Sequence, residues 1–206
     1  MKKLISLLLA LMMLAVMAAG CAGNGDETTA GTTEGKIDVP ASALEILENI
    51  WALYGENDKF PIVGGDTASH LAQMEKDENY VMPSAPGKFA LTETDELTFN
   101  MLVPAEQQSK LSDAATMTHM MNSNNFSCGV YRMSAADADN FAAAMKTAVT
   151  GNQWMCGMPE SLLIAVIAEE YVLVAWGVND AMGPFETKLT SAYPAAKLVV
   201  DEAITG

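Results

Sequence analysis

LLIAVIAEEYVLVAW, residues 162–176, decides the fold of this 206-residue chain. The apolar runs Leu162–Ala168 and Tyr171–Trp176 are rich in residues that favour strands, and they predict two strands joined by a tight turn. Neither run alternates strictly between apolar and polar residues, so we expect central strands that are covered on both faces. Glu169 and Glu170 are poor turn residues for a two-residue hairpin, which leaves the register at this turn open.

The segment before this hairpin predicts a second unit of the same kind. Residues 114–121 and 126–133 have strand character, and the turn-forming stretch Asn122–Asn125 separates them. Ser134 is a typical N-cap, and the apolar side chains that follow recur at helical spacing until Gly151, so we expect a helix over Ala135–Thr150.

The segment after the hairpin completes the pattern. We expect a helix from about Asp180, with Pro184 in its first turn, that ends at Pro194. Lys197–Val200 then predicts a short closing strand. The C-terminal half therefore has the order ββα–ββα–β, which predicts an α+β class with a mainly antiparallel sheet and two or three packed helices. We expect one such domain over residues 39–206.

The N-terminal half carries fewer structural signals. Ser42 and Glu45 form a capping box, and the apolar side chains after them recur at helical spacing up to Gly55, so we expect a helix over about 43–54. Residues 55–90 are rich in Gly, Pro, Asp and Asn and predict a long irregular segment, functional or disordered. A shorter acidic helix is expected over 93–102.

The first residues predict the compartment of the protein. Lys2 and Lys3 precede an apolar run over residues 4–17, and small residues lead into Cys21, as in a secretory signal rather than a membrane span. The junction Ala-Ala-Gly-Cys resembles the lipobox of bacterial lipoproteins, which implies that residues 1–20 are a signal peptide and that Cys21 carries diacylglycerol. Residues 21–38 then predict a lipidated, disordered tether on the extracytoplasmic face of the cell membrane.

The charge of the chain restricts its partners. The formal net charge is −15, and removing residues 1–20, which carry two Lys, gives −15 − 2 = −17. This excess of acid argues against binding to nucleic acid and against adhesion to anionic lipid by surface charge. The membrane would be a partner through the lipid anchor alone. The acidic surface either attracts cations or basic peptides, or simply keeps the protein soluble.

Two further segments carry a family resemblance. FSCGVY (126–131) and QWMCGMP (153–159), together with the lipobox and the helix at 43–54, resemble a group of small Gram-positive surface lipoproteins. Some members are labelled bacteriocin transport accessory proteins, and that label implies a thioredoxin-like protein. The chain has no Cys-x-x-Cys, which that redox chemistry requires.

Cys128 and Cys156 are the only cysteines besides Cys21. Outside the cell an even pair predicts a disulfide, which would close a loop of about 28 residues and stabilise the fold by roughly 3–4 kcal/mol. The alternative is two buried free thiols that behave as small apolar side chains.

Three other groups are weak candidates for sites. Met117, His119 and Met121 alternate, so on a strand they would share one face and could hold Cu(I), or they could be a core stripe. Trp154 and Met155 lie between Gly151 and Gly157, which predicts either an exposed recognition loop or a Trp wedge over the end of the sheet. The acidic cluster over 75–78 lacks the spacing of a calcium loop and is more typical of a solvated loop.

The sequence offers no catalytic motif. It has no Gly-x-Ser-x-Gly, His-Glu-x-x-His or Gly-x-x-x-x-Gly-Lys, and no cofactor is implied. We therefore expect a non-enzymatic, membrane-anchored binding or interaction module. The alternative is an accessory protein of a transporter or envelope enzyme, with an envelope protein as partner and thiol chemistry as one version of it. A two-lobed substrate-binding protein would need more length than this chain has.

Overall fold

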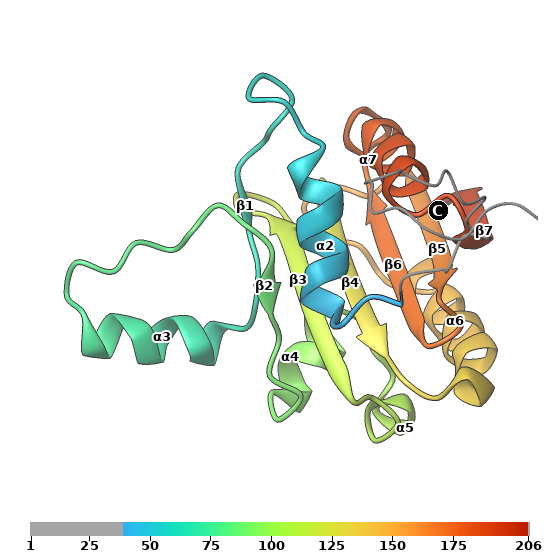
Figure 1. The fold of residues 1–206 in the computed structure, drawn as a ribbon, viewed down its shortest axis with the longest axis horizontal. Coiled ribbons are helices and arrows are strands. Elements are labelled where there is room, and N and C mark those ends of the chain that lie inside the picture. The colour runs from blue at the N-terminus through green and yellow to red at the C-terminus, as the bar shows by residue number, and fades with distance from the viewer. Residues whose placement is uncertain (1–38, 206) are drawn as a thin grey trace, which may run out of the picture. The chain divides into compact units, whose positions relative to one another are not determined.

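The computed structural model describes residues 39–205, which lie in one compact unit, Ile37–Gly206. Within these residues the structure has six helices and seven strands, an α+β arrangement with an antiparallel sheet and packed helices (Figure 1). None of the helices found in residues 39–205 combines the length and the apolar character that a membrane crossing requires. Cys21, the signal peptide expected over 1–20 and the tether expected over 21–38 lie outside the described residues.

The C-terminal half follows the predicted order ββα–ββα–β. Its elements are β3 (Asp113–His119), β4 (Phe126–Arg132), α6 (Ala135–Thr150), β5 (Ser161–Ile167), β6 (Tyr171–Gly177), α7 (Asn179–Ala192) and β7 (Lys197–Ala203). The strand expected over 197–200 is three residues longer than predicted, and the one expected over 114–121 stops at His119. Pro184 lies inside α7 rather than in its first turn, because the helix already begins at Asn179.

The strands pair in the order β1-β3-β4-β6-β5-β7, and every pairing is antiparallel. In this order β6, not β5, lies next to β4. The helix α6 therefore connects β4 to β5, which lies two places away, and α7 likewise connects β6 to β7. Strands two places apart in an antiparallel sheet run parallel, and such crossovers are right-handed. Since β4 and β6 run in opposite directions, the same hand places α6 and α7 on opposite faces.

Both faces of the central strands are covered, as the continuous apolar runs predict. One core cluster joins α2 (Ala43–Ala52) and α7 to the sheet, and it contains Val130, Leu173 and Phe185. The other joins α6 and α4 (Thr94–Phe99) to the opposite face, and it contains Phe141, Val172 and Trp176. All residues of β6 are buried.

The helix α2 begins as predicted and ends two residues earlier. The Ser42 side chain accepts a hydrogen bond from the Glu45 backbone N–H (3.1 Å), and the Glu45 carboxylate accepts one from the Ala41 N–H (2.7 Å). This arrangement closes the first turn, as a capping box does. The helix contacts β3 and β4, whereas α7 covers β5 and β6 on the same face.

One expectation from the sequence is wrong, and two others are made more exact. The segment 55–90 is not irregular throughout: it holds β1 (Ile62–Val63), α3 (Thr67–Lys76) and β2 (Gly87–Lys88), which the Gly and Pro around them obscure. The acidic helix expected over 93–102 is present but shorter, as α4, and a further short helix, α5 (Ala105–Gln108), follows after Pro104. The register of the β5–β6 hairpin, which the sequence left open, pairs Ile167 with Tyr171; the turn spans 168–170, and both Ala168 (φ 48°) and Glu169 (φ 63°) have positive φ.

The outer edge of β3 is shared by two short strands. β1 pairs with Thr118 and His119, and β2 pairs with Ala115 and Thr116. The chain between them, residues 66–86, carries α3 and projects from this edge of the sheet (Figure 1). We call residues 66–86 the arm.

Candidate functional site

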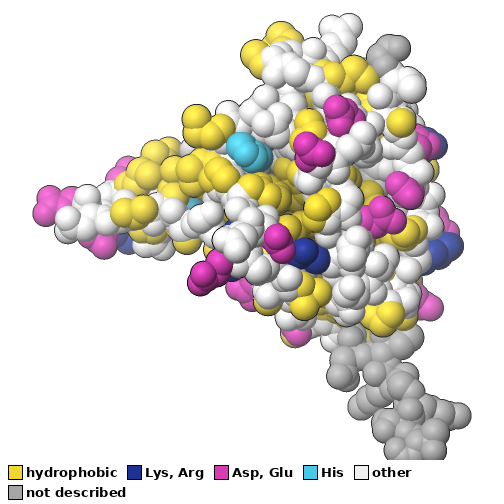
Figure 2. Space-filling view, turned by 90° about the horizontal axis from the view of Figure 1, so that it is seen from above, with side chains coloured by type: hydrophobic (Ala, Val, Ile, Leu, Met, Phe, Trp, Pro, Cys, Tyr) yellow, Lys and Arg dark blue, Asp and Glu magenta, His cyan; other side chains and the backbone are white. Residues whose placement is uncertain are grey.

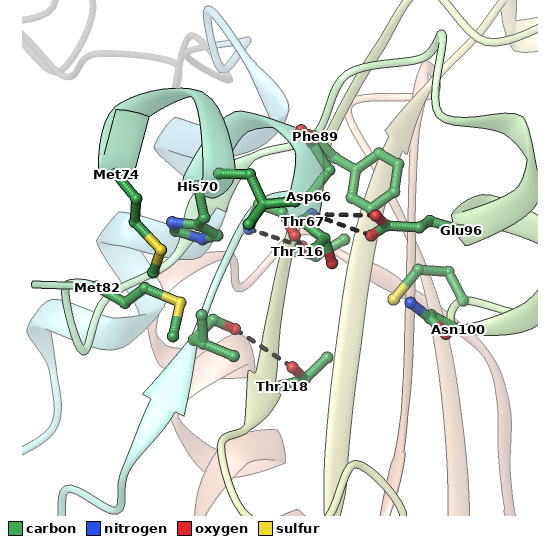
Figure 3. Close-up of a pocket in the computed structure, with 14 residues that line it drawn as sticks. Asp66, Thr67, His70, Met74, Met82, Phe89, Glu96, Asn100, Thr116 and Thr118 are labelled. Carbon is green, nitrogen blue, oxygen red and sulfur yellow. Dashed lines mark hydrogen bonds between the residues drawn. The ribbon is translucent and has the colours of Figure 1, made fainter. Parts of the chain in front are cut away.

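A cleft of about 420 Å³ lies between the arm, β1, the adjoining part of β3 and α4 (Figure 3). It lies on the same face of the sheet as α6, at the edge that α6 does not reach, because α6 packs on β5 and β6 while the cleft lies beside β3. Its apolar lining is Val63, Leu71, Met74, Met82, Phe89 and Met101, and its polar lining includes Asp66, Thr67, His70, Glu96, Asn100, Thr116 and Thr118. A cleft of this size and lining is typical of a site for an apolar group.

Glycines at the base of the arm let two chain segments pass in close contact. A Cβ atom on Gly64 would collide with the backbone nitrogen of Gly87, and one on Gly87 would collide with the Gly64 carbonyl carbon. Gly65 has φ +89°, a conformation that side chains disfavour. The chain can therefore enter and leave the arm side by side only with glycine at these positions.

Asp66 fixes the start of α3 on the body of the protein. Its buried carboxylate accepts hydrogen bonds from the Ser69 N–H (2.7 Å), the Ser69 hydroxyl (2.9 Å) and the Ala90 N–H (2.9 Å). Burial alone would raise the pKa of Asp66, but these hydrogen bonds outweigh it and hold the pKa below its ordinary value. The carboxylate is thus both an N-cap and a link to the segment before α4.

Glu96 supports the same helix end from α4. Both of its carboxylate oxygens lie within 3.2 Å of the Thr67 N–H, so α3 receives a second carboxylate at its N-terminus (Figure 3). A helix N-terminus favours negative charge because its first N–H groups are unpaired. Two acidic side chains of the cleft therefore have structural partners already.

His70 connects α3 to both sides of the arm. Its Nε2 lies 2.8 Å from the Gly64 carbonyl oxygen, and its Nδ1 lies 2.8 Å from the Tyr80 hydroxyl. A carbonyl oxygen only accepts, so Nε2 carries a hydrogen, and in the neutral ring Nδ1 accepts from Tyr80. Both ring nitrogens are engaged, which leaves His70 without a free nitrogen for a metal or for proton transfer.

Two threonines on β3 hold the entry to the arm. The Thr116 hydroxyl accepts from the Gly65 N–H (3.0 Å) and donates to the Gly65 carbonyl oxygen (3.1 Å), and the Thr118 hydroxyl donates to the Val63 carbonyl oxygen (3.3 Å). Hydrogen bonds therefore fix the base of the arm to β3. The apolar side chains farther along the arm, in contrast, are not buried.

The apolar side chains of the arm face the cleft without being buried. Leu71 is 54% exposed, Met74 41% and Met82 37%, and α3 has no buried residue. Met74 and Met82 point toward the cleft from opposite sides of the arm (Figure 3), and hydrophobic side chains gather along the projecting arm in Figure 2. Proteins rarely expose a contiguous group of apolar side chains to water unless that group binds a ligand or a partner.

The predicted copper candidate is not a site in this structure. Met117 is fully buried in the core cluster under α2. His119 stacks on Phe60 (ring centroids 5.9 Å apart), and its Nδ1 accepts hydrogen bonds from the Met121 and Asn122 N–H groups. Met121 lies beyond the end of β3 and is 81% exposed. The alternation breaks where the strand ends, so the three side chains do not converge.

The predicted disulfide is also wrong, because Cys128 and Cys156 are both free thiols. Cys128 sits inside β4, opposite Met117 and Ala175, and points into the core under α2, where burial raises its pKa well above the ordinary value. Cys156 is exposed in the loop before β5. The alternative of a buried, apolar thiol thus describes Cys128 but not Cys156.

In the loop that contains Trp154 and Met155, one residue fits the predicted wedge over the sheet and the other fits the predicted exposed loop. Trp154 is half-buried and packs on Trp176 (ring centroids 6.1 Å apart), as a wedge over the end of the sheet does. Met155 is 80% exposed. Asn124 donates hydrogen bonds to the Met155 and Gly157 carbonyl oxygens, and Asn122 donates to that of Cys156, so the loop is attached to the β3–β4 turn.

The acidic cluster lies at the end of the arm. Glu75, Asp77 and Glu78 are exposed there, and within residues 39–205 no three His, Cys, Asp or Glu side chains are arranged to hold a metal ion. The cleft itself is not predicted from the sequence. A signal was present: Gly64-Gly65-Asp66 followed by Ser69 predicts a close approach and an N-cap, and Leu71 and Met74 follow at helical spacing.

No family model matches this chain, no curated protein matches it, and no solved structure matches it. The resemblance to small Gram-positive surface lipoproteins stays a prediction from the sequence.

Proposed function

We propose that this chain is a membrane-anchored extracytoplasmic lipoprotein that works as a non-enzymatic binding module, with the cleft beside the arm as its binding site. The observation that supports the binding site is the open apolar lining. Leu71, Met74 and Met82 expose large apolar side chains next to a cleft of about 420 Å³. Burying them against a ligand would release about 25 cal/mol for each Å² of apolar surface removed from water.

The polar groups of the cleft support binding rather than catalysis. The carboxylates of Asp66 and Glu96 accept backbone hydrogen bonds that hold α3, and both nitrogens of His70 are engaged. A general base or nucleophile needs an unengaged atom that can reach the substrate. These three side chains instead fix the wall against which an apolar group would pack.

A neutral fluorescent probe of apolar sites, N-phenyl-1-naphthylamine, tests the cleft. We expect its emission to rise with the protein, and we expect Leu71→Ala combined with Met74→Ala to weaken this binding at least about fivefold, since each truncation removes apolar contact area. Alanine keeps α3 helical. Met121→Ala combined with Met155→Ala is the matched control, because both methionines are exposed and neither lines the cleft. Equal binding by the two double variants would contradict the proposal.

The membrane anchor has its own test. Cys21 follows an apolar segment and small residues, which supports lipidation at its thiol. We expect labelled palmitate to be incorporated into the protein and the protein to sediment with membranes, and we expect Cys21→Ser to abolish both. A Cys21→Ser protein that is still labelled and still sediments would contradict this part of the proposal.

The accessory-protein alternative uses the same cleft. In that case the ligand is a segment of an envelope protein rather than a small molecule. Its thiol-redox version lacks support, because Cys128 is buried with a raised pKa and is not bonded to Cys156. A resting thiol of this kind is unreactive.

A further inference from the structure

The face of α3 that lines the cleft is built like one side of a helix–helix contact. Thr67, His70, Leu71 and Met74 stand at positions i, i+3, i+4 and i+7, and all four line the cleft. This spacing places them on one face, about 10 Å long at 1.5 Å per residue. Within the described residues no other element packs over this face, so α3 has no buried residue.

We infer that the occupant of the cleft is a cationic amphipathic helix of a partner polypeptide, its apolar side against Leu71, Met74 and Met82 and its Lys and Arg side chains toward the acidic residues around the arm. This inference rests on the proposed function, because it names the class of ligand for the same cleft. Three properties of the site lead to it: the state of the backbone groups, the charge, and the type of apolar side chain.

The backbone groups of the cleft are already bonded. The Gly65 N–H and carbonyl oxygen bond to Thr116, the Val63 carbonyl oxygen to Thr118, the Gly64 carbonyl oxygen to His70, and the Thr67 N–H to Glu96. An extended peptide that joins a sheet edge needs free backbone donors and acceptors. A ligand here must bind through side chains, as a helix in a groove does.

The charge around the cleft selects a basic partner. Between residues 66 and 96 the chain holds seven acidic residues, Asp66, Glu75, Asp77, Glu78, Glu93, Asp95 and Glu96, against Lys76 and Lys88. No Lys or Arg lines the cleft, and the Lys88 ammonium lies 3.9 Å from Asp113. Side chains of Asp and Glu are visible at the end of the arm in Figure 2. Such a surface attracts cationic peptides and repels anionic bilayers.

Three of these acids have free carboxylates. Glu75, Glu78 and Asp95 are exposed, and none of them makes a salt bridge or side-chain hydrogen bond to another described residue. Glu75 follows Met74 on α3, and Asp95 precedes Glu96 on α4. Glu75 and Asp95 thus adjoin lining residues on two different helices, so Lys or Arg beside the apolar face of a bound helix would reach them.

The apolar side chains suit a helix more than a fixed small ligand. Met74, Met82 and Met101 are three of the six apolar lining residues. Methionine is unbranched and polarizable, and it adapts to the irregular surface of a helix. Phe99, three residues after Glu96 on α4, is also 76% exposed.

Fluorescence anisotropy with two designed peptides tests the inference. One is a rhodamine-labelled 14-residue amphipathic helix of Leu and Lys, and the other has Glu in place of Lys. The protein is the chain from residue 22 on, which contains the whole compact unit with both core clusters. We expect the Leu/Lys peptide to bind and the Leu/Glu peptide not to bind. We expect Leu71→Ala combined with Met74→Ala to weaken the Leu/Lys peptide at least about fivefold.

A matched pair of triple variants separates the local charge from the total charge. Glu75→Gln, Glu78→Gln and Asp95→Asn remove the free acids beside the cleft, and we expect binding to weaken about tenfold at low salt. Glu48→Gln, Asp139→Asn and Asp201→Asn remove the same charge from α2, α6 and β7, and we expect a change of less than about twofold. Equal losses in the two triple variants, or equal binding of the two peptides, would overturn the inference.

The remaining outcomes distinguish this inference from the proposed function. If N-phenyl-1-naphthylamine binds in the cleft and the Leu/Lys peptide does not, the occupant is a small apolar molecule: the inference fails and the proposed function stands. If neither binds, both fail. If the protein sediments with vesicles of phosphatidylcholine and phosphatidylglycerol, and Leu71→Ala with Met74→Ala abolishes this, the cleft docks on a bilayer and the inference is wrong.

Discussion

The centre of the sheet and the arm contain the same kinds of apolar residue, but these residues are buried in the sheet and exposed in the arm. In β6 every residue is buried between α2 and α7 on one face and α6 on the other. In the arm, Leu71, Met74 and Met82 stay exposed around the cleft, and polar contacts such as those of Asp66, Thr116 and His70 fix the base. The difference shows that an apolar side chain stabilises this fold only where two layers meet. Where one layer is missing, the same side chain is available for a ligand.

Truncation of a core side chain should separate the two regions most strongly. Phe141 on α6 is fully buried and packs on Tyr131, with ring centroids 5.2 Å apart. We expect Phe141→Ala to lower the free energy of unfolding by about 3–5 kcal/mol, because it removes buried contacts and leaves a cavity. We expect Leu71→Ala in the arm to change it by less than about 0.5 kcal/mol. Urea denaturation measures both, and a comparable loss for Leu71→Ala would mean that the arm is part of the core.

Gly64 should tolerate no side chain, although it lies in the less buried region. Its Cβ atom would collide with the backbone of Gly87, which cannot move aside as a flexible side chain does. We expect Gly64→Ala to destabilise the protein by roughly 3 kcal/mol. Gly183 is the control: it lies inside α7 with no atom within 4 Å of a new Cβ. There, Gly183→Ala should stabilise by about 0.5–1 kcal/mol. Similar effects at both positions would refute the close approach at the base of the arm.

The two free cysteines extend the comparison to chemistry. Cys128 lies in the core and Cys156 in an exposed loop. In the chain from residue 22 on, which lacks Cys21, we expect native protein to take up one alkylating group, at Cys156, and denatured, unreduced protein to take up two. We also expect Cys128→Ser to destabilise by about 2 kcal/mol, since it buries a hydroxyl in an apolar site, and Cys156→Ser to have little effect. No uptake by denatured, unreduced protein would show that the pair is bonded.

Acid should loosen the base of the arm through Asp66. Its pKa is held below the ordinary value of 3.8 in the folded state, so its contribution is present above the unfolded pKa and is lost as pH falls through the folded pKa. We expect Asp66→Asn to reduce stability by about 1 kcal/mol at pH 7. The decline in stability below about pH 4 should also be smaller in the variant. Parallel pH profiles for the two proteins would contradict this role of the carboxylate.

The candidate site was less predictable than the fold, for a physical reason. The order ββα–ββα–β and the helix after Ser42 follow from local periodicity, because burial on one or both faces of an element repeats along its own sequence. The cleft has no such repeat. Its lining comes from β1, α3, α4 and β3, and each contributes only a few side chains. Gly64 and Gly87 are 23 positions apart in the sequence, and only the folded structure brings them into contact.

The sequence by itself determined the buried hairpin over 162–176, the α+β class and the capped helix α2, since these depend on neighbouring residues along one chain segment. Tertiary structure alone decided the position of β6 between β4 and β5, the burial of Cys128 and Met117, and the exposure of Leu71 and Met74. Those outcomes depend on which layer covers a given face. That is a property of distant segments, and the same apolar residue type fits either result.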